Sequence, residues 1–416
     1  MSDKQKKKTH KKRLLIVEII VLLCLLGGGY LYHIMTAKRP VAPVILKQQE
    51  KKAENVSAQM VDKENRNVQL EPVYKTILLV GLDVRNQEQM DYSNSDTMIL
   101  TSIDEVSGNI RMASIYRDTL LNINTREGDP RIEDIKNGAE GSTDIGRYDK
   151  ANAAYANGGI KQLMEMVDNN LDISVDDYII VNFSAVAEVV DDLGGIDVWM
   201  TRQEVIHMNN YCVETSSVTG KPYTPVEPDE EAREYHLNGV QAVSYARIRY
   251  TKGNDMKRAQ RQRVVINKII AKAKQQPLDA IKSMITNVLP NCRTSLSFPD
   301  ILSYAANMEY YQIEKTTGFP FVHIEKFCSP NGKTIDPVVP VTLQSNVKEL
   351  HKFFYNDEEY TTTTLTDCFS NGIEEISGLT EYDIDYATQN SVIADAGGEA
   401  DIVDEVLVEE SEPITE

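Results

Sequence analysis

The first hydrophobic feature along the chain is an unbroken apolar run. Residues 14–32, LLIVEIIVLLCLLGGGYLY, contain one charged residue, Glu18. A helix of about 20 such residues is long enough to cross the hydrocarbon core of a bilayer. The run therefore predicts a transmembrane helix over residues 14–35, since the alternative, a buried core helix, leaves the basic cluster before it unexplained.

Beyond residue 71, short apolar runs alternate with longer stretches of helical period. The runs predict strands at 75–82, 97–103, 109–115, 177–182, 196–200 and 242–250, with a strand pair near 321–326 and 338–343. The periodic stretches predict helices at 152–171, 183–193, 256–274, 279–288 and 298–308. Residues 201–234 are polar and predict an irregular insertion. This alternation favours one α/β domain, a mixed β-sheet covered by helices on both faces.

The segments around this domain differ from it in composition. Residues 36–70 carry two prolines and many polar residues, which predicts an extracytoplasmic stalk. The globular domain is expected over 71–356. Residues 357–416 are Thr-rich and then acidic, which predicts a solvated, disordered tail apart from one amphipathic piece at 401–408.

Charge is distributed unevenly along the 416 residues, whose formal net charge is -19. Residues 1–13 hold seven Lys or Arg, and residues 371–416 hold fourteen Asp or Glu and no Lys or Arg. The basic N-terminus predicts a cytoplasmic start and an extracytoplasmic remainder. With no small-residue cleavage site close behind the apolar run, an uncleaved signal-anchor in the cell membrane is expected. The mild acidity between the two ends argues against nucleic-acid binding.

Four of the five cysteines lie beyond the apolar run. Cys212, Cys292, Cys328 and Cys368 are widely spaced and form no C-x-x-C pattern, whereas Cys24 falls within the run. Outside the cell this spacing favours structural disulfides over a metal site. Three pairings are possible, and the sequence does not choose among them.

The densest candidate chemistry is the arginine-rich stretch SYARIRYTKGNDMKRAQRQR. On the predicted strand Arg247 and Arg249 share one face. On the helix that follows, Arg258 and Gln262 share one side, with Arg261 one step round. Because guanidinium groups pair bidentately with phosphate, the set predicts a diphosphate ligand. The alternative is an exposed edge strand and a solvated helix face.

Carboxylates at strand ends form a second candidate site. Asp83 follows the first strand, and Asp96 directly precedes the second. Two carboxylates with phosphate oxygens suit Mg²⁺, although Asp in such places is more often a turn-former. Arg85 follows Asp83 closely, and the third strand ends in Arg117 and Asp118. The sequence contains no G-x-S-x-G elbow, H-E-x-x-H motif or Walker loop.

Taken in order, these residues and their surroundings resemble the LytR-CpsA-Psr family. The resemblance covers residues 75–275 and rests on ten ordered blocks: GLDVR at 81–85, SDTMIL at 95–100, SIYRD at 114–118, NAAY at 152–155, GG at 158–159, VNF at 181–183, VDDLGGIDV at 190–198, HLNG at 236–239, YARIR at 245–249 and RAQRQ at 258–262.

The resemblance implies a Mg²⁺-dependent phosphotransferase of the Gram-positive envelope. Such an enzyme moves an anionic glycopolymer, wall teichoic acid or capsular polysaccharide, from a polyprenyl-pyrophosphate carrier to peptidoglycan and releases polyprenyl phosphate. It implies Asp83 and Asp96 as metal ligands. The implied diphosphate-binding residues are Arg85, Arg117, Arg247, Arg249, Arg258 and Gln262. The expected catalytic residues are Asp96, Arg117, Arg247 and Arg249. Possible accessory residues are Asp118, Asp255 and Arg261.

Two positions depart from the family pattern. Asn94 stands where an Arg usually precedes the Ser-Asp pair, and Tyr116 stands where a Pro is usual. The first removes one expected phosphate contact, and the second is expected to alter a turn more than the chemistry.

Several questions stay open at this level. The proton acceptor is Asp96 or Asp118. A lipid carrier requires an apolar tunnel, expected between the sheet and its helices. The alternatives to transfer are a membrane-bound transcriptional attenuator, for which thirteen cytoplasmic residues are few, and a lipid-pyrophosphate hydrolase. The glycopolymer, the acceptor sugar and the oligomeric state are not identified.

Overall fold

The computed structural model describes residues 72–84, 90, 93–249 and 254–391. The predicted transmembrane helix, the stalk, Arg85 and the amphipathic piece at 401–408 lie outside the described residues. Within the described part, every helix is too short or too polar to cross a bilayer.

A six-stranded mixed sheet forms the centre of the fold, in the order β10-β3-β2-β1-β6-β9. Its strands are β1 (Tyr74–Leu82), β2 (Ser95–Asp104), β3 (Asn109–Ile115), β6 (Asp177–Asn182), β9 (Arg293–Thr294) and β10 (Gln312–Phe319). β1 runs antiparallel to β2 and parallel to β6, while β3 runs antiparallel to β2 and parallel to β10. The predicted mixed sheet is confirmed.

The hairpin between β2 and β3 turns at Gly108, whose φ is +75°. Because residues with a Cβ rarely adopt this region, glycine suits the turn. From there the register runs from Ile103 opposite Ile110 to Ile99 opposite Ser114. The turn thereby aligns the two strands as the sequence predicts.

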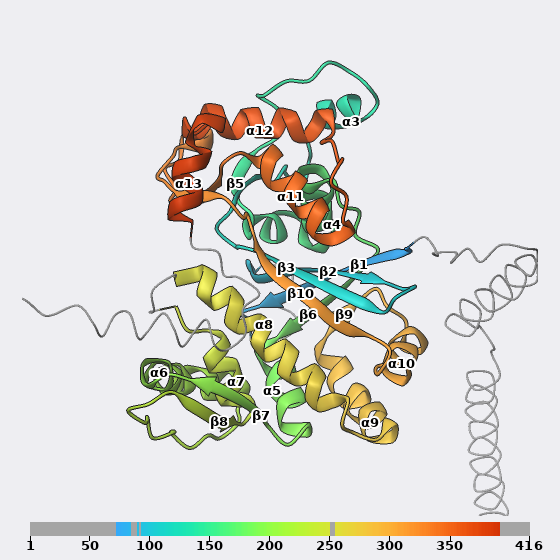
Figure 1. Cartoon of the computed structure of the whole chain (residues 1–416), viewed down its shortest axis with the longest axis vertical. Helices are drawn as coiled ribbons and strands as arrows, with labels where there is room; N and C mark the ends of the chain where they lie inside the picture. The colour runs from blue at the N-terminus through green and yellow to red at the C-terminus, as the bar shows by residue number, and fades with distance from the viewer. Residues whose placement is uncertain (1–71, 85–89, 91–92, 250–253, 392–416) are drawn as a thin grey trace, which may run out of the picture. The chain divides into compact units, whose positions relative to one another are not determined.

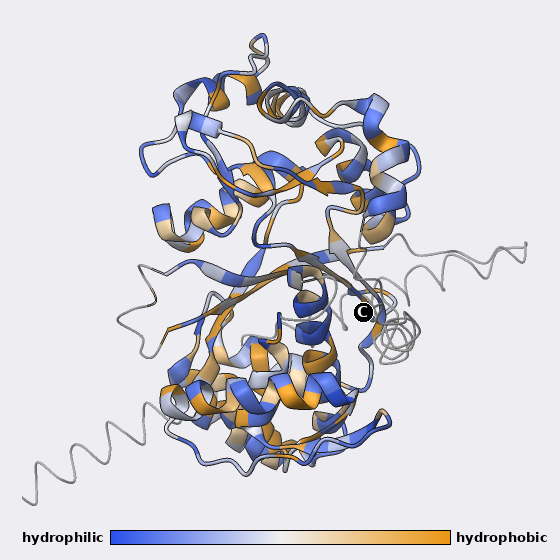
Figure 2. Cartoon of the chain, turned by 90° about the vertical axis from the view of Figure 1, so that its left-hand side faces the viewer, coloured by the Kyte–Doolittle hydropathy of each residue, from blue (hydrophilic) through white to orange (hydrophobic). Residues whose placement is uncertain are grey.

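Helices cover both faces of the sheet (Figure 1). On one face lie α4 (Ala153–Leu171), α11 (Leu343–Tyr355) and α12 (Thr364–Ser377); on the other lie α5 (Phe183–Asp192), α7 (Gly239–Ala246), α8 (Asn254–Ala273), α9 (Leu278–Val288) and α10 (Phe298–Ala306). Along β1, Leu78 and Val80 pack into the core of the first face, whereas Ile77 and Leu79 belong to the second. Hydrophobic residues accordingly run along the strands and the helices packed on them (Figure 2).

Smaller elements complete the described chain. These are α3 (Pro130–Lys136), α6 (Arg202–Thr219), α13 (Ile384–Asn390), the strand pairs β4 (Leu120–Asn122) with β5 (Tyr148–Lys150), β7 (Ile196–Met200) with β8 (Arg233–Leu237) and β11 (His323–Glu325) with β12 (Val338–Pro340), and 3-10 turns at Leu289–Asn291, Pro330–Gly332 and Glu381–Asp383.

Two predictions between residues 201 and 250 are wrong. The supposed irregular insertion contains α6, which starts with a capping box of Thr201 and Glu204 and buries Val205, Met208 and Cys212 at helical spacing. Over its described residues, 242–249, the predicted strand 242–250 is instead the end of α7 and the turn after it. Its β-favouring residues are overruled by a capping box at Asn238 and by packing on α5 and α6.

The expected disorder after residue 356 is also corrected. Thr363 caps α12, and Leu365, Phe369 and Ile373 recur every four residues and pack into the core of the first face. The surrounding threonines and acidic residues hide this stripe in the sequence. The described chain is therefore folded to residue 391.

The expected disulfides are absent among the described residues. Cys212, Cys292, Cys328 and Cys368 are free thiols, and all except Cys292 are buried. Burial raises the pKa of Cys292 to about 11, with Glu188 adding to the effect. The three buried cysteines act as small apolar residues of the core rather than as crosslinks.

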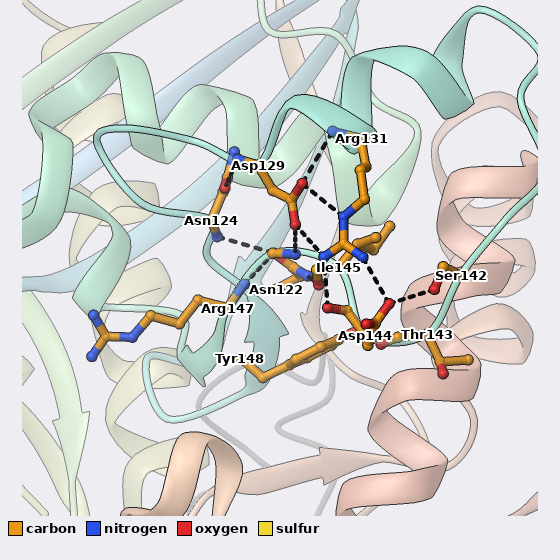
Figure 3. Close-up of polar contacts among 11 residues, drawn as sticks. Asn122, Asn124, Asp129, Arg131, Ser142, Thr143, Asp144, Ile145, Arg147 and Tyr148 are labelled. Atoms are coloured by element: carbon orange, nitrogen blue, oxygen red, sulfur yellow. Dashed lines mark hydrogen bonds and ion pairs between the residues drawn. The ribbon is translucent and has the colours of Figure 1, made fainter.

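A polar network holds the loop around α3, as Figure 3 shows. Asp129 caps the helix by accepting a hydrogen bond from the Arg131 amide, and its other oxygen accepts one from the Gly146 amide. The Arg131 guanidinium bridges Asp129 at 2.7 Å and Asp144 at 2.9 Å. Backbone capping and mutual pairing account for these groups, so we assign the network to loop structure.

Acid sensitivity is expected from His323, whose side chain is buried against the Tyr116 ring with Nδ1 3.1 Å from the Pro320 carbonyl oxygen. Burial lowers its pKa to about 4, whereas in an unfolded chain it is about 6.5. The unfolded chain therefore takes up the proton first, and stability that is complete above pH 6.5 falls by about 3 kcal/mol as the pH approaches 4.

The substitution His323→Gln should remove this contribution. Chemical denaturation of both proteins at pH 7.5 and pH 4.5 measures it: the wild-type protein should lose more free energy of unfolding between the two values than the variant does. An equal loss in both would show that His323 is not the group responsible.

Candidate active site

An apolar pocket of about 550 Å³ lies between the second face of the sheet and helices α5, α7 and α8. β1, β2 and β6 supply its floor, because alternate side chains of each strand point to this face. Among its apolar lining residues are Leu79, Ile99, Ile179, Val189, Val265 and Ile266. Such a lining suits a hydrocarbon chain.

Seven charged or polar residues singled out in the sequence line the same pocket. They are Asp83, Asp96, Arg117, Arg247, Arg249, Arg258 and Gln262. They come from the end of β1, the start of β2, the turn after β3, the turn after α7, and α8. The structure thus brings together side chains that are up to 179 residues apart in the sequence.

Asp96 is surrounded by arginines. Its Oδ1 accepts a hydrogen bond from Arg117 Nη1 at 2.8 Å, and its Oδ2 lies 3.8 Å from Arg249 Nη2. The Asp96 backbone carbonyl accepts a hydrogen bond from Arg258 Nη2 at 2.9 Å. Burial raises the pKa of Asp96, but Arg258 and Arg117 lower it more, so the carboxyl is ionised and its pKa lies below the usual range.

Arg247 is held on several sides. One guanidinium nitrogen donates to Thr215 Oγ1 at 3.0 Å, and the other lies 3.0 Å from Glu214 Oε2 and 3.6 Å from Asp83 Oδ2. The group also stacks over the rings of Phe183 and Tyr211, at 4.6 and 5.4 Å from their centroids. These contacts fix its plane against the pocket wall.

Asp255, in the first turn of α8, is a buried carboxylate among three arginines. Its Oδ1 lies 2.8 Å from Arg258 Nη2, 3.5 Å from Arg117 Nε and 3.8 Å from Arg249 Nε. Burial raises its pKa, against the opposing effect of Arg258 and Arg117. Asp255 thus links the three arginines to one another.

The two carboxylates predicted to hold a metal ion differ in environment. Burial raises the pKa of Asp83, which Arg247 lowers and Asp96 raises again. Asp83 and Asp96 are thus close enough to repel each other, and a divalent cation near both carboxylates would relieve this repulsion. Two carboxylates plus ligand phosphate oxygens form a donor set that fits Mg²⁺. No group of three or more His, Cys, Asp or Glu suited to a metal occurs in the described part of the chain.

Some predicted residues lie elsewhere. Arg261 is buried on another side of α8 and pairs with Glu204 rather than lining the pocket. Asp118 lies beyond Arg117, with Oδ1 3.4 Å from Lys150 Nζ. Since residues 242–249 form the end of α7 and a turn, Arg247 and Arg249 reach the pocket from that turn instead of from one strand face.

The two departures from the family pattern have different surroundings. Asn94 is exposed and does not line the pocket. Tyr116 is buried; its amide donates to the Phe319 carbonyl, and its ring fills space beside Gly318, where a Cβ would collide with its hydroxyl. Tyr116 is therefore a packing residue at the turn that carries Arg117.

Four contact residues of Arg247 were missed in the sequence. Tyr211, Glu214 and Thr215 come from α6, and Phe183 begins α5. Recognising α6 from the spacing of Val205 and its successors would have placed the first three on neighbouring turns. Their approach to Arg247 depends on how α6 packs on α7, which the sequence alone does not reveal.

Comparison with known proteins identifies the family that has this arrangement of residues. The sequence profile of the LytR_cpsA_psr family matches residues 43–322. The chain belongs to the LytR-CpsA-Psr family. The predicted membership is confirmed, and the match includes every pocket residue named above.

Two LytR-CpsA-Psr relatives show what the family includes. A polyisoprenyl-teichoic acid–peptidoglycan teichoic acid transferase, TagU of Enterococcus faecalis, is 30% identical over 232 residues, 55% of this chain and 64% of the relative. Biofilm regulatory protein A of Streptococcus mutans is 30% identical over 241 residues, 55% of this chain and 53% of the relative. The chain thus spans less than two thirds of either relative.

A solved structure confirms the fold. Protein gbs0355 of Streptococcus agalactiae superimposes with a TM-score of 0.55 at 24% identity, covering 76% of this chain and 96% of that protein. At this identity the likeness concerns the arrangement of the sheet and its helices.

Proposed function

We propose that this protein transfers an anionic glycopolymer, of the wall teichoic acid or capsular type, from a polyprenyl-diphosphate carrier to peptidoglycan. The observation that carries the proposal is a single pocket that is apolar along the sheet and lined by arginines and carboxylates where β1 ends and β2 begins. A lipid diphosphate has the same two parts in the same order. The transferase name of the Enterococcus faecalis relative supports this substrate class.

The arginine end of the pocket suits the diphosphate. Arg117, Arg247, Arg249 and Arg258 approach from three separate segments, and Gln262 adds an amide. Planar guanidinium groups stabilise charge spread over phosphate oxygens, which increases as the phosphoanhydride bond breaks. In the absence of ligand, the carboxylates Asp96, Asp255 and Glu214 compensate these charges.

Mg²⁺ is proposed as the cofactor, held by Asp83 and Asp96. When bound, it would neutralise phosphate charge and help to orient the diphosphate. Arg247 and Arg117, each in contact with one of these carboxylates, would hold them in place.

The reaction is a phosphoryl-type displacement. A peptidoglycan hydroxyl attacks the phosphorus next to the glycopolymer, a new phosphodiester bond forms, the phosphoanhydride bond breaks, and polyprenyl phosphate leaves with the electron pair. The hydroxyl proton is taken by one of two carboxylates that pair with Arg117: Asp96, which lines the pocket, or Asp118, which lies outside its lining. Asp118 is one-fifth exposed and lies beside Lys150.

The proposed location follows from the charge pattern of the N-terminus. The segment 14–35 would anchor the chain in the cell membrane with residues 1–13 in the cytoplasm, and the domain would act outside the cell on membrane-borne lipid and on peptidoglycan. A topology reporter fused to the C-terminus tests this location. A cytoplasmic C-terminus would exclude the transferase and favour the regulatory alternative. The name of the Streptococcus mutans relative, a biofilm regulatory protein, is the reason for testing that alternative.

The decisive experiment supplies the purified protein, in detergent with Mg²⁺, with a lipid-diphosphate glycan, with and without peptidoglycan fragments. A transferase yields a covalent glycan–peptidoglycan conjugate and releases polyprenyl phosphate only with acceptor. Release of free glycan at the same rate without acceptor would indicate a hydrolase instead.

A further inference from the structure

The two arginines after α7 lie on a short turn whose middle residue is buried. Arg247 ends α7 and reaches Asp83, while Arg249 reaches Asp96 and Asp255. Between them Ile248 is fully buried and points into the core shared by α6, α7 and α8. The position of this turn therefore decides where both guanidinium groups lie.

A buried ion pair contacts the turn from behind. Arg261 of α8 donates from Nε to Glu204 Oε1 at 2.9 Å and from Nη1 to the Ile248 carbonyl oxygen at 3.3 Å. The side chains of Arg261 and Glu204 are 2% and 1% exposed. One guanidinium thus binds α6 and the turn at once, within the group of helices α6, α7 and α8 (Figure 1).

Glu204 is itself fixed at both oxygens. Its Oε2 accepts hydrogen bonds from the Thr201 amide at 3.0 Å and the Thr201 hydroxyl at 3.2 Å, closing the capping box at the start of α6. The other oxygen is left to Arg261. The pair therefore connects the first turn of α6, the middle of α8 and the turn that carries Arg247 and Arg249.

We propose that the Glu204–Arg261 pair is a positioning element that sets the turn 247–249, and with it the two arginines that face the diphosphate. The inference rests on the proposed function and extends it to residues outside the pocket. Burying two charges is unfavourable unless they pair closely and their remaining hydrogen-bonding groups find partners. Apolar residues of similar size often give the same or greater stability. The fork of Arg261 is used here to hold a backbone carbonyl beside the site.

Arginine is required because lysine cannot make both contacts in this geometry. The donors of a lysine all lie on one nitrogen at the end of a flexible side chain. The planar guanidinium instead presents Nε to Glu204 and Nη1 to the Ile248 carbonyl at the same time. The substitution Arg261→Lys keeps the charge and the ion pair but should release the carbonyl. Glu204→Gln keeps the shape and capping contacts while removing the charge that orients Arg261.

A matched control exists on the other side of the fold. Arg111 pairs with Glu314 at 2.8 Å and donates to the Phe353 carbonyl at 2.8 Å, the same combination of carboxylate and backbone acceptor. These residues lie outside the pocket. Arg111→Lys therefore controls for the loss of a bifunctional arginine that does not position the site.

The test measures binding of inorganic pyrophosphate with Mg²⁺ by calorimetry, and glycopolymer transfer, for the wild-type protein and the three variants. Partial unfolding reduces the number of binding sites but not the Kd of the folded fraction, so a purely structural role changes stoichiometry alone. Positioning predicts a Kd weakened about tenfold and kcat/KM lowered by about tenfold or more in Arg261→Lys and Glu204→Gln, because misplacement by about 1 Å costs up to 100-fold. Arg111→Lys should stay within twofold.

Wild-type Kd and kcat/KM in folded Arg261→Lys and Glu204→Gln would overturn the positioning role while leaving the transferase intact. A wild-type protein that binds pyrophosphate but forms no conjugate would instead refute the proposed function, and the Kd difference would still decide whether the pair positions the anion site.

Discussion

Replacing Asp96 by asparagine is expected to reduce glycopolymer transfer by about 1,000-fold. Asp96 is the one residue in the pocket that is both a proposed metal ligand and a hydrogen-bond acceptor of Arg117, and it lies near Arg249 as well. The amide keeps the shape but loses the charge that compensates the arginines and that would attract the proposed Mg²⁺. Single-turnover transfer at saturating Mg²⁺ measures the effect on the chemical step.

The control for this variant is Asp177→Asn. Asp177 begins β6, pairs with Lys75 at 2.8 Å and accepts a hydrogen bond from Ser295, so it is a carboxylate of the same sheet that lies outside the pocket. It should retain transfer within a factor of two. Transfer by Asp96→Asn within tenfold of the wild-type rate would remove Asp96 from the reaction.

Filling the apolar pocket is expected to weaken binding of the lipid chain without changing binding of the diphosphate headgroup. Ala246, at the end of α7, lines the pocket and is only partly buried, so Ala246→Trp places a large ring in the space assigned to the hydrocarbon chain. Displacing three methylene groups costs about 2 kcal/mol, which is about thirty-fold in affinity. The KM for a long-chain polyprenyl-diphosphate glycan should rise by this factor.

Two comparisons make the result specific. The Kd for inorganic pyrophosphate should not change, since it needs only the arginine end. Ala280→Trp, on an exposed position of α9, should leave both values as in the wild type. If Ala246→Trp binds the long-chain substrate as tightly as the wild type does, the pocket is not the site of the lipid.

Much of the central sheet could be predicted from the sequence because its strands are short apolar runs between turn residues. The runs at 75–82 and 109–115 match β1 and β3 closely, and Gly108 marks the hairpin. Helix α8 was predicted within two residues of its bounds because its apolar period is long and regular.

The errors come from local patterns that tertiary contacts overrule. The alternation in YARIR resembles a strand, yet the Asn238 and Gln241 capping box and the close approach of Gly239 to α5 select a helix. Any Cβ at Gly239 would collide with the Ala187 backbone, and such a contact cannot be deduced from the sequence alone.

The candidate site was easier to predict than the elements that carry it. Arg247, Arg249, Asp83 and Asp96 were selected for their charge and for blocks shared with a family, and both signals survive an error in secondary structure. Arg261 shows the opposite case, because two arginines three residues apart on α8 look equivalent in sequence, and only burial separates Arg258 at the pocket from Arg261 behind the turn.

The helix α12 sets a lower limit to the minimal folding unit. Its Phe369 is completely buried against the same cluster as Leu78 and Val80 of β1, so residues from the two ends of the described chain complete one core. A protein shortened to residue 356 would expose that core to water and associate with itself. Because Ala387 of α13 belongs to the same cluster and the Ser391 hydroxyl donates to the His323 carbonyl, the same limit extends to residue 391.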